Sequence, residues 1–186
     1  YKQNPKTFAD PPYHWAFKPT VIWHTLIHMD YGDSVIYADS NYVFRKYPDR
    51  LLKTAFLHDI YTYDHSPNAY YPNACWTYRD TFVKMGCDEE KYWKAFQYHA
   101  DVLCIRKNAF TMNFVEEWKN FTCDYETIAV NNLENFPCYN DHRDDQSVFS
   151  ILAVKHNIPA SRNPADILWE EEGIDLNDRK FSNAIL

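Results

Sequence analysis

Segments with helical periodicity alternate with two short apolar runs, and this alternation constrains the fold more than any other feature of the sequence. The runs lie at 34–38 and 101–107, and each has the length of a buried strand. Apolar side chains recur at helical spacing in the segments 19–29, 49–58, 79–86, 88–96, 111–121 and 144–156. The pattern predicts an α/β fold in which a central mixed β-sheet is flanked by helices.

Length and charge limit the class of protein. A chain of 186 residues can bury a sizeable core, so we expect one domain over 1–186. Lys and Arg number 19 and Asp and Glu number 26, so the net charge is −7, which argues against general attraction to nucleic acid or to an anionic membrane. No apolar run approaches the roughly 18 residues of a membrane span. An anionic ligand must therefore meet local positive charge or a metal ion.

The cysteines favour a reducing compartment. The chain has five cysteines, at positions Cys75, Cys87, Cys104, Cys123 and Cys138. None of them forms a C-x-x-C pair, which argues against a zinc site and against a disulfide framework. The N-terminal residues lack the apolar core of a signal peptide. We therefore expect reduced thiols and a cytoplasmic protein.

A first polar cluster follows the first apolar run. Asp39, Ser40 and Asn41 come where α/β sheets keep their ligand sites. Asp39 and Asn41 offer hard oxygen ligands, which suit a Mg²⁺ or Mn²⁺ ion that keeps several waters and shares the phosphates of a ligand. Asp and Asn also stabilise turns through their own backbone, so a simple turn is the alternative.

A second polar cluster precedes the helical pattern at 144–156. It contains His142, Arg143, Asp144, Asp145 and Gln146. Asp144 or Asp145 alone is explained as a helix cap. Because a cap does not require His, Arg and Gln beside it, ligand binding or catalysis is an equally good explanation of the cluster.

Five stretches of the chain, in order, resemble motifs of nucleotide-sugar glycosyltransferases with the GT-A fold: YHWAFKPTVIWHTL at 13–26, GDSVIYADSN at 32–41, TYRDTFVKMGCDEEKYW at 77–93, FQYHADVLCIRKNAFTMNFVEEW at 96–118 and DHRDDQSVFSILAVKHNI at 141–158. Five ordered motifs are much more specific than one. The resemblance implies a Rossmann-like GT-A domain that moves a hexosyl or deoxyhexosyl group from a nucleoside-diphosphate sugar, with uridine as base by analogy, to a glycan or glycoprotein acceptor.

The resemblance extends to a biological setting. Several such domains belong to large DNA viruses and microbes that decorate surface glycans. The short length and the fifteen tyrosines resemble the capsid-glycosylating transferase domains of large DNA viruses such as the chlorella viruses. For a viral protein the implied location is the cytoplasm of the host.

The resemblance also assigns the donor site. Asp39 and Asn41 match the D-x-D-like motif that holds Mn²⁺ or Mg²⁺ against the donor diphosphate, with Ser40 between them. Asn41 stands where the family carries a second Asp, and losing one carboxylate weakens metal affinity. Lys18 is the expected cation for the diphosphate, and an ordinary surface lysine before Pro19 is the alternative.

By the same resemblance, the second polar cluster binds the sugar group of the donor. Asp145 and Gln146 match the family's catalytic D-Q, and His142 and Arg143 lie near the phosphates or the metal. Gln97 and Asp101, at the entry to the second apolar run, are expected to bind hydroxyls of the donor sugar. An inverting enzyme would use Asp145 as the base, whereas a retaining enzyme needs only a group on the β face of the sugar. Family analogy favours retention.

The N-terminus departs from the family pattern. Transferases of this fold usually begin with a strand that holds the nucleotide base, and residues 1–15 offer none. Either the chain is a fragment of a longer protein, or its base pocket is built differently. This departure and Asn41 leave a second hypothesis open, a sugar- or nucleotide-binding module without turnover.

Overall fold

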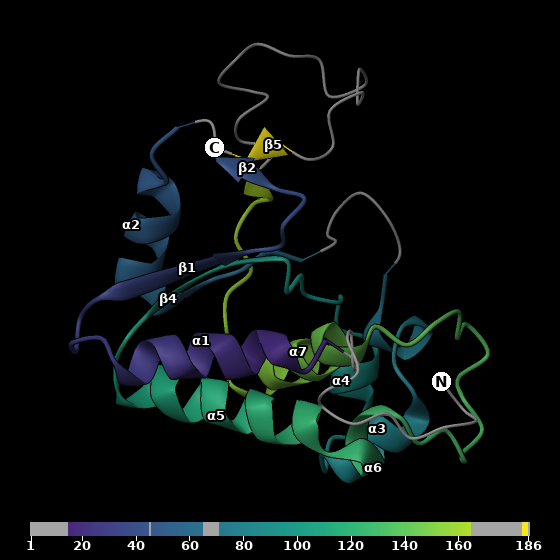
Figure 1. Ribbon diagram of the computed structural model, residues 1–186. Coiled ribbons are helices and arrows are strands. Elements are labelled where there is room, and N and C mark those ends of the chain that lie inside the picture. Colours follow the sequence, from purple (N-terminus) through teal and green to yellow (C-terminus); the bar gives the residue numbers. More distant parts are fainter. Residues whose placement is uncertain (1–14, 45, 65–70, 165–183, 186) are drawn as a thin grey trace, which may run out of the picture.

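The computed structural model describes residues 15–44, 46–64, 71–164 and 184–185. A three-stranded sheet lies between α2 on one face and a layer of α1, α5 and α7 on the other (Figure 1). The sheet has the order β1 (Ser34–Ala38), β4 (Val102–Arg106), β3 (Ile60–Tyr61). The structure is therefore of the α/β class that the sequence predicts.

Strand direction differs from the expectation of a mixed central sheet. Both pairings in the described sheet, β1 with β4 and β3 with β4, are antiparallel. The parallel pairing, β2 (Val43–Phe44) with β5 (Ala184–Ile185), lies in a separate two-stranded sheet. Periodicity reveals where a strand lies but not its direction, because the long segment between β1 and β4 permits either.

Six of the described helices begin and end within three residues of the predicted positions, whereas the helix at Tyr125–Ile128 was not predicted. The helices are α1 (Phe17–Ile27), α2 (Asp49–His58), α3 (Arg79–Lys84), α4 (Glu90–Trp93), α5 (Ala109–Cys123), α6 (Tyr125–Ile128) and α7 (Asp144–Lys155), with a 3₁₀ turn at Asn73–Cys75. Pro19 is the third residue of α1 rather than the first, which is tolerated because N–H groups of the first turn have no partner within the helix. None of these helices, in the ranges described, is long and apolar enough to cross a membrane.

Alternate residues of β4 enter two separate cores. Leu103 and Ile105 pack with the layer of α1, α5 and α7, whereas Val102 and Cys104 pack with α2. This division follows from the two-residue period of a strand. Strand β4 is buried as predicted, but β1 is only half-buried.

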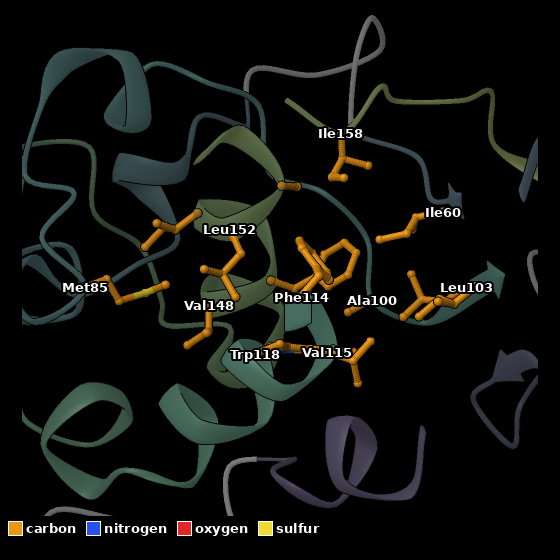
Figure 2. Close-up of a cluster of buried hydrophobic side chains, with 14 of the residues drawn as sticks. Ile60, Met85, Ala100, Leu103, Phe114, Val115, Trp118, Val148, Leu152 and Ile158 are labelled. Atoms are coloured by element: carbon orange, nitrogen blue, oxygen red, sulfur yellow. The ribbon is translucent and has the colours of Figure 1, made fainter. Parts of the chain in front are cut away.

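The larger core fixes the start of α7. Figure 2 shows Phe114, Val115 and Trp118 of α5 beside Val148 and Leu152 of α7. Trp118 is fully buried, and its indole N–H donates to the carbonyl oxygen of Asp145 at 2.9 Å. A buried indole N–H requires such a partner, so this contact ties the first turn of α7 to α5.

A disulfide corrects the expectation of reduced thiols. Cys75 is bonded to Cys138, 63 positions along the chain, and Cys87, Cys104 and Cys123 are free. Cysteine spacing did not predict this pair, because the fold brings the two residues together from distant segments. Disulfides persist mainly in oxidising compartments, so the pair counts against a cytoplasmic location, which stays a prediction.

Loss of the disulfide is expected to lower the free energy of unfolding by about 2–4 kcal/mol, because the bond restricts the unfolded chain. Denaturant unfolding of Cys75→Ser, with Cys123→Ser as the control, measures this loss. Alkylation of the denatured, unreduced protein should label three of the five cysteines. Five labelled cysteines would show that the bond does not form.

Candidate functional site

The ends of two antiparallel strands meet at the edge of the sheet where the first polar cluster lies. β1 ends at Ala38 and β4 begins at Val102, so Asp39 and Asp101 are neighbours. The backbone N–H of Asp39 donates to the carbonyl oxygen of Asp101 at 2.9 Å. Asp39 is therefore held at this edge by the sheet itself.

The first turn of α1 brings Lys18 to the same edge. Its Nζ lies 3.2 Å from both carboxylate oxygens of Asp39 and 3.4 Å from the carbonyl oxygen of Ala100. Asp145, at the start of α7, places its Oδ2 3.7 Å from the same Nζ. The Lys18 side chain is only 7% exposed and that of Asp145 3%, so the structure contradicts an ordinary surface lysine. A buried ammonium requires such partners.

Aromatic side chains complete the surroundings of Lys18. The hydroxyl of Tyr37 donates to Asp39 Oδ1 at 2.8 Å. Burial, together with the hydrogen bond to Asp39, raises the pKa of Tyr37, so this hydroxyl remains a donor at neutral pH. The Lys18 ammonium lies 5.2 Å from the ring centre of Trp15 and 5.9 Å from that of Tyr37, within the range of cation–π attraction.

These side chains line a cavity of about 320 Å³. Its described lining consists of Trp15, Lys18, Asp39, Asp141, His142, Arg143, Asp144, Asp145 and Gln146. Four of these residues are aspartates, against the permanent cations Lys18 and Arg143. The cavity thus joins the two polar clusters of the sequence, and carboxylates outnumber cations in it.

Two of the lining residues have left-handed backbones. Trp15 has a φ of 57° and Asp144 a φ of 47°. Such backbones are unfavourable for residues other than glycine, particularly for a bulky tryptophan, and they cluster at functional sites. Their presence in the lining of one cavity supports a functional role for it.

The buried carboxyl group of Asp145 has an altered acidity. Its Oδ2 is inaccessible and, among the described residues, has no hydrogen-bond partner. Burial raises the pKa of Asp145 from 3.8 to about 8, and the charges of Asp144 and Asp39 add to this, although Lys18 opposes it. Burial thus favours the protonated form of Asp145 in the ligand-free protein.

The helix-cap explanation of the second cluster does not fit. In the described residues no side chain forms a hydrogen bond that caps the start of α7. The backbone N–H of Arg143 instead donates to the hydroxyl of Ser147 at 3.1 Å and to the carbonyl oxygen of Trp76 at 3.2 Å. Asp145 thus lines the cavity without acting as the N-cap of α7.

His142 and Arg143 line the cavity, and contacts with Tyr78 and Trp76 hold their segment in place. His142 stacks on Tyr78 with ring centres 4.2 Å apart and accepts the Tyr78 backbone N–H at Nδ1 at 3.2 Å. The Arg143 guanidinium lies over the ring of Trp76 at 4.5 Å. The Cys75–Cys138 disulfide closes the same region, so these contacts fix the wall formed by 141–143.

Gln97 lies behind the cavity rather than in its lining. The Gln146 side-chain amide donates to Gln97 Oε1 at 3.0 Å, and Gln97 Nε2 donates to the carbonyl oxygen of Trp76 at 3.3 Å. Gln97 is 1% exposed, whereas Gln146 lines the cavity. Its observed contact orients Gln146, and direct binding of a sugar by Gln97 stays a prediction.

Asp101 is the centre of a second network. Its carboxylate accepts hydrogen bonds from the hydroxyls of Tyr63, at 2.8 Å, and Tyr42, and His99 Nδ1 lies 3.4 Å away. Burial raises the pKa of Asp101, but these partners outweigh it and hold that pKa well below its ordinary value. Asp101 thus anchors the loop after β1, and binding of sugar hydroxyls by Asp101 stays a prediction.

The predicted metal ligands are not gathered into a closed site. Asp39 lines the cavity, but Ser40 and Asn41 are exposed and do not belong to its described lining. In the described ranges, no three His, Cys, Asp or Glu side chains are placed to hold a metal ion together. A metal at Asp39 would need oxygen ligands from a bound molecule or water.

Sequence reasoning missed the aromatic members of the site. Trp15 and Tyr37 contact Lys18, and Tyr42 and Tyr63 hold Asp101. A signal existed for Tyr37, which lies two positions before Asp39 and so on the same side of an extended chain. Tyr63 gave no local signal, because its contact with Asp101 joins distant segments.

Comparison with models of known protein families, with curated proteins and with solved structures found no match.

The raised pKa of Asp145 predicts a pH effect on stability. Folding raises this pKa from 3.8 to about 8, so the folded state binds the extra proton between these values. The free energy of unfolding should fall as pH rises from about 4 to about 8. Asp145→Asn, which stays neutral, should reduce this decline, as denaturant unfolding at several pH values would show. If the free energy of unfolding changes with pH in the same way in Asp145→Asn and in the parent, the raised pKa does not belong to Asp145. The control variant is Asp141→Asn, because Asp141 is exposed.

Proposed function

We propose that the protein is a glycosyltransferase of the GT-A type, which moves a hexosyl or deoxyhexosyl group from a nucleoside-diphosphate sugar to a glycan or glycoprotein acceptor. The observation that carries the proposal is the convergence of Lys18, Asp39 and Asp145 in one cavity with His142, Arg143 and Gln146. The motif resemblance assigns these six residues to one donor site, and they come from distant parts of the chain.

The charge of the cavity supports a metal-assisted reaction. Its described lining has four aspartates and two permanent cations, so a diphosphate entering alone would meet repulsion. Asp39 would hold a Mn²⁺ or Mg²⁺ ion together with diphosphate oxygens and water, with Asn41 as the second expected ligand. When bound, such an ion neutralises the charge that develops on the leaving nucleoside diphosphate.

Lys18 would have one role before the donor binds and another once it is bound. In the ligand-free protein its ammonium neutralises Asp39 and lies near Asp145. A cation bound to Asp39 would neutralise the Asp39 carboxylate in place of Lys18. The Lys18 ammonium could then attract the phosphates from its present position. Burial strengthens this attraction because little water screens it.

Asp145 and Gln146 are assigned to the sugar end. The motif resemblance favours retention, in which Asp145 or Gln146 contacts the β face of the sugar without acting as a strong base. A cation bound at Asp39 would favour the ionised form of Asp145, whose negative charge would then stabilise the positive charge that develops on the sugar. Gln97 would keep the Gln146 amide in place for that contact.

A binding module without turnover is the second candidate function. It is favoured by Asn41, which stands where the motif has a carboxylate, and by its exposed position outside the lining of the cavity. The two candidates differ in one observable, because a transferase hydrolyses its donor slowly even without an acceptor and a pure binder does not.

Donor hydrolysis separates the candidates. With Mn²⁺ and a panel of nucleotide sugars, the parent protein should release free sugar, and Asp145→Asn should lose at least roughly 10²-fold of this rate with nucleotide affinity kept. Asp141→Asn, at the exposed rim of the same cavity, is the matched control and should stay active. No hydrolysis of any donor by the parent, together with nucleotide binding, would establish the binding module.

Calorimetry tests the roles of Lys18 and the metal. Mn²⁺ and a nucleoside diphosphate should each bind more tightly in the presence of the other, because Asp39 alone offers too few ligands. Lys18→Ala should weaken diphosphate binding by about 1–3 kcal/mol and leave nucleoside binding nearly unchanged. Equal losses for both ligands, with a lowered melting temperature, would point to damage of the cavity instead.

A further inference from the structure

The sequence contains one Asn-x-Ser/Thr sequon, Asn120-Phe121-Thr122, which lies in the last turn of α5. In a chain that enters the secretory pathway, the side-chain amide of such an Asn accepts an N-linked oligosaccharide, provided that the middle residue is not Pro. Because so short a motif also occurs by chance, the surroundings of Asn120 and Thr122 decide whether it has a function in this fold.

Asn120 lies on the solvent side of α5. It is exposed, as are Asn113 and Glu116, which precede it at helical spacing and so share its side of the helix. Trp118, only two positions before Asn120, is fully buried and points toward the core. A bulky, hydrophilic group attached to Asn120 would therefore extend into solvent and leave the core undisturbed.

The surface beside Asn120 is hollowed by a cavity of about 480 Å³. Its described lining consists of Asn113, Glu116, Glu117, Asn120, Phe121 and Asp124. Amide and carboxylate groups are hydrogen-bond partners for sugar hydroxyls, and the half-buried ring of Phe121 offers an apolar surface. The first sugars of a glycan on Asn120 thus have both room and polar partners.

The third residue of the sequon carries a hydroxyl group that the described fold does not use. Thr122 is fully buried, and among the described residues its Oγ1 has no hydrogen-bond partner. Burying an unpaired hydroxyl costs free energy, and valine would fill the same space without that cost. Glycan transfer supplies a reason for the hydroxyl, because the sequon requires Ser or Thr at this position.

The Cys75–Cys138 disulfide favours the compartment in which N-glycans are added. Disulfides persist in secreted proteins and in the lumen of the endoplasmic reticulum, and they are rare in the cytosol. The bond and the sequon are independent features of the chain, since they involve different residues and different chemistry. Both point to the secretory pathway rather than to the cytoplasmic location expected from the sequence.

We propose that Asn120 carries an N-linked glycan. The co-reactant is an oligosaccharide attached to a lipid pyrophosphate, and the amide nitrogen of Asn120 attacks its anomeric carbon. A C–N bond forms as the C–O bond to the pyrophosphate breaks, the nitrogen loses one proton, and the lipid pyrophosphate leaves with the bonding electrons. The residues around Asn120 do not line the candidate transferase cavity, so the site is independent of the proposed function.

The structure also sets the order of events. Residues two positions apart lie on different sides of a helix, and Thr122 is buried when α5 is formed. An enzyme that must reach the Asn120 amide and the Thr122 hydroxyl together can therefore act only before α5 packs on the core. The glycan is added to the unfolded chain, and the folded protein then carries it on its surface.

Expression of the whole chain behind a secretory signal in eukaryotic cells tests the site. Treatment with peptide N-glycosidase should lower the mass of the protein and convert Asn120 to Asp, as peptide mass spectrometry would show. Asn120→Gln and Thr122→Val should each abolish the mass change, whereas Thr122→Ser, which keeps the hydroxyl, should retain it. The matched control is Asn113→Gln, which removes an exposed Asn on the same side of α5 and should keep the glycan.

Two results would overturn the proposal. The first is protein without the mass change in both the secreted and the retained fractions, since transfer precedes folding and is visible in either. The second is a mass change that persists in Asn120→Gln. Denaturant unfolding of the enzymatically deglycosylated parent and of Thr122→Val completes the test, because the variant should be at least as stable if the Thr122 hydroxyl serves the glycan rather than the fold.

Discussion

The buried ammonium group of Lys18 holds the candidate site together. It joins the first turn of α1 to the loop after β1 through Asp39, to the segment before β4 through Ala100, and to the start of α7 through Asp145. Burying a charge is costly unless it is paired, so the fold must bring these partners to Lys18. The sheet places Asp39 and the core between α5 and α7 places Asp145, so the fold supplies these partners around one ammonium group.

Charge limits the ligands that the candidate site is expected to bind. Around Lys18 the aspartates outnumber the cations, so an anionic ligand is expected to arrive with a metal ion. Basic side chains are also grouped on the chain, since Arg50, Lys53 and Arg162 line one cavity between α2 and segment 160–162. The sequence, with its net charge of −7, shows only the sum of these opposed regions.

Local pattern predicted much of the fold and the core of the site. The bounds of α2, β1 and β4 agree closely with the periodicity, because the side-chain spacing of a helix or strand is visible within one segment. Lys18, Asp39 and Asp145 were expected at one site from their motifs, and they do meet. The Cys75–Cys138 bond, the contact of Tyr63 with Asp101 and the direction of the strands were not predictable, because each depends on distant segments coming together.

A crystal structure with Mn²⁺ and a nucleoside diphosphate would test the central claim most directly, since the anomalous signal of manganese locates the ion. The proposed function predicts a manganese peak beside the Asp39 carboxylate, with the diphosphate between it and the Lys18 ammonium. Manganese bound away from Asp39, or a diphosphate bound away from Lys18, would contradict the assignment of the site.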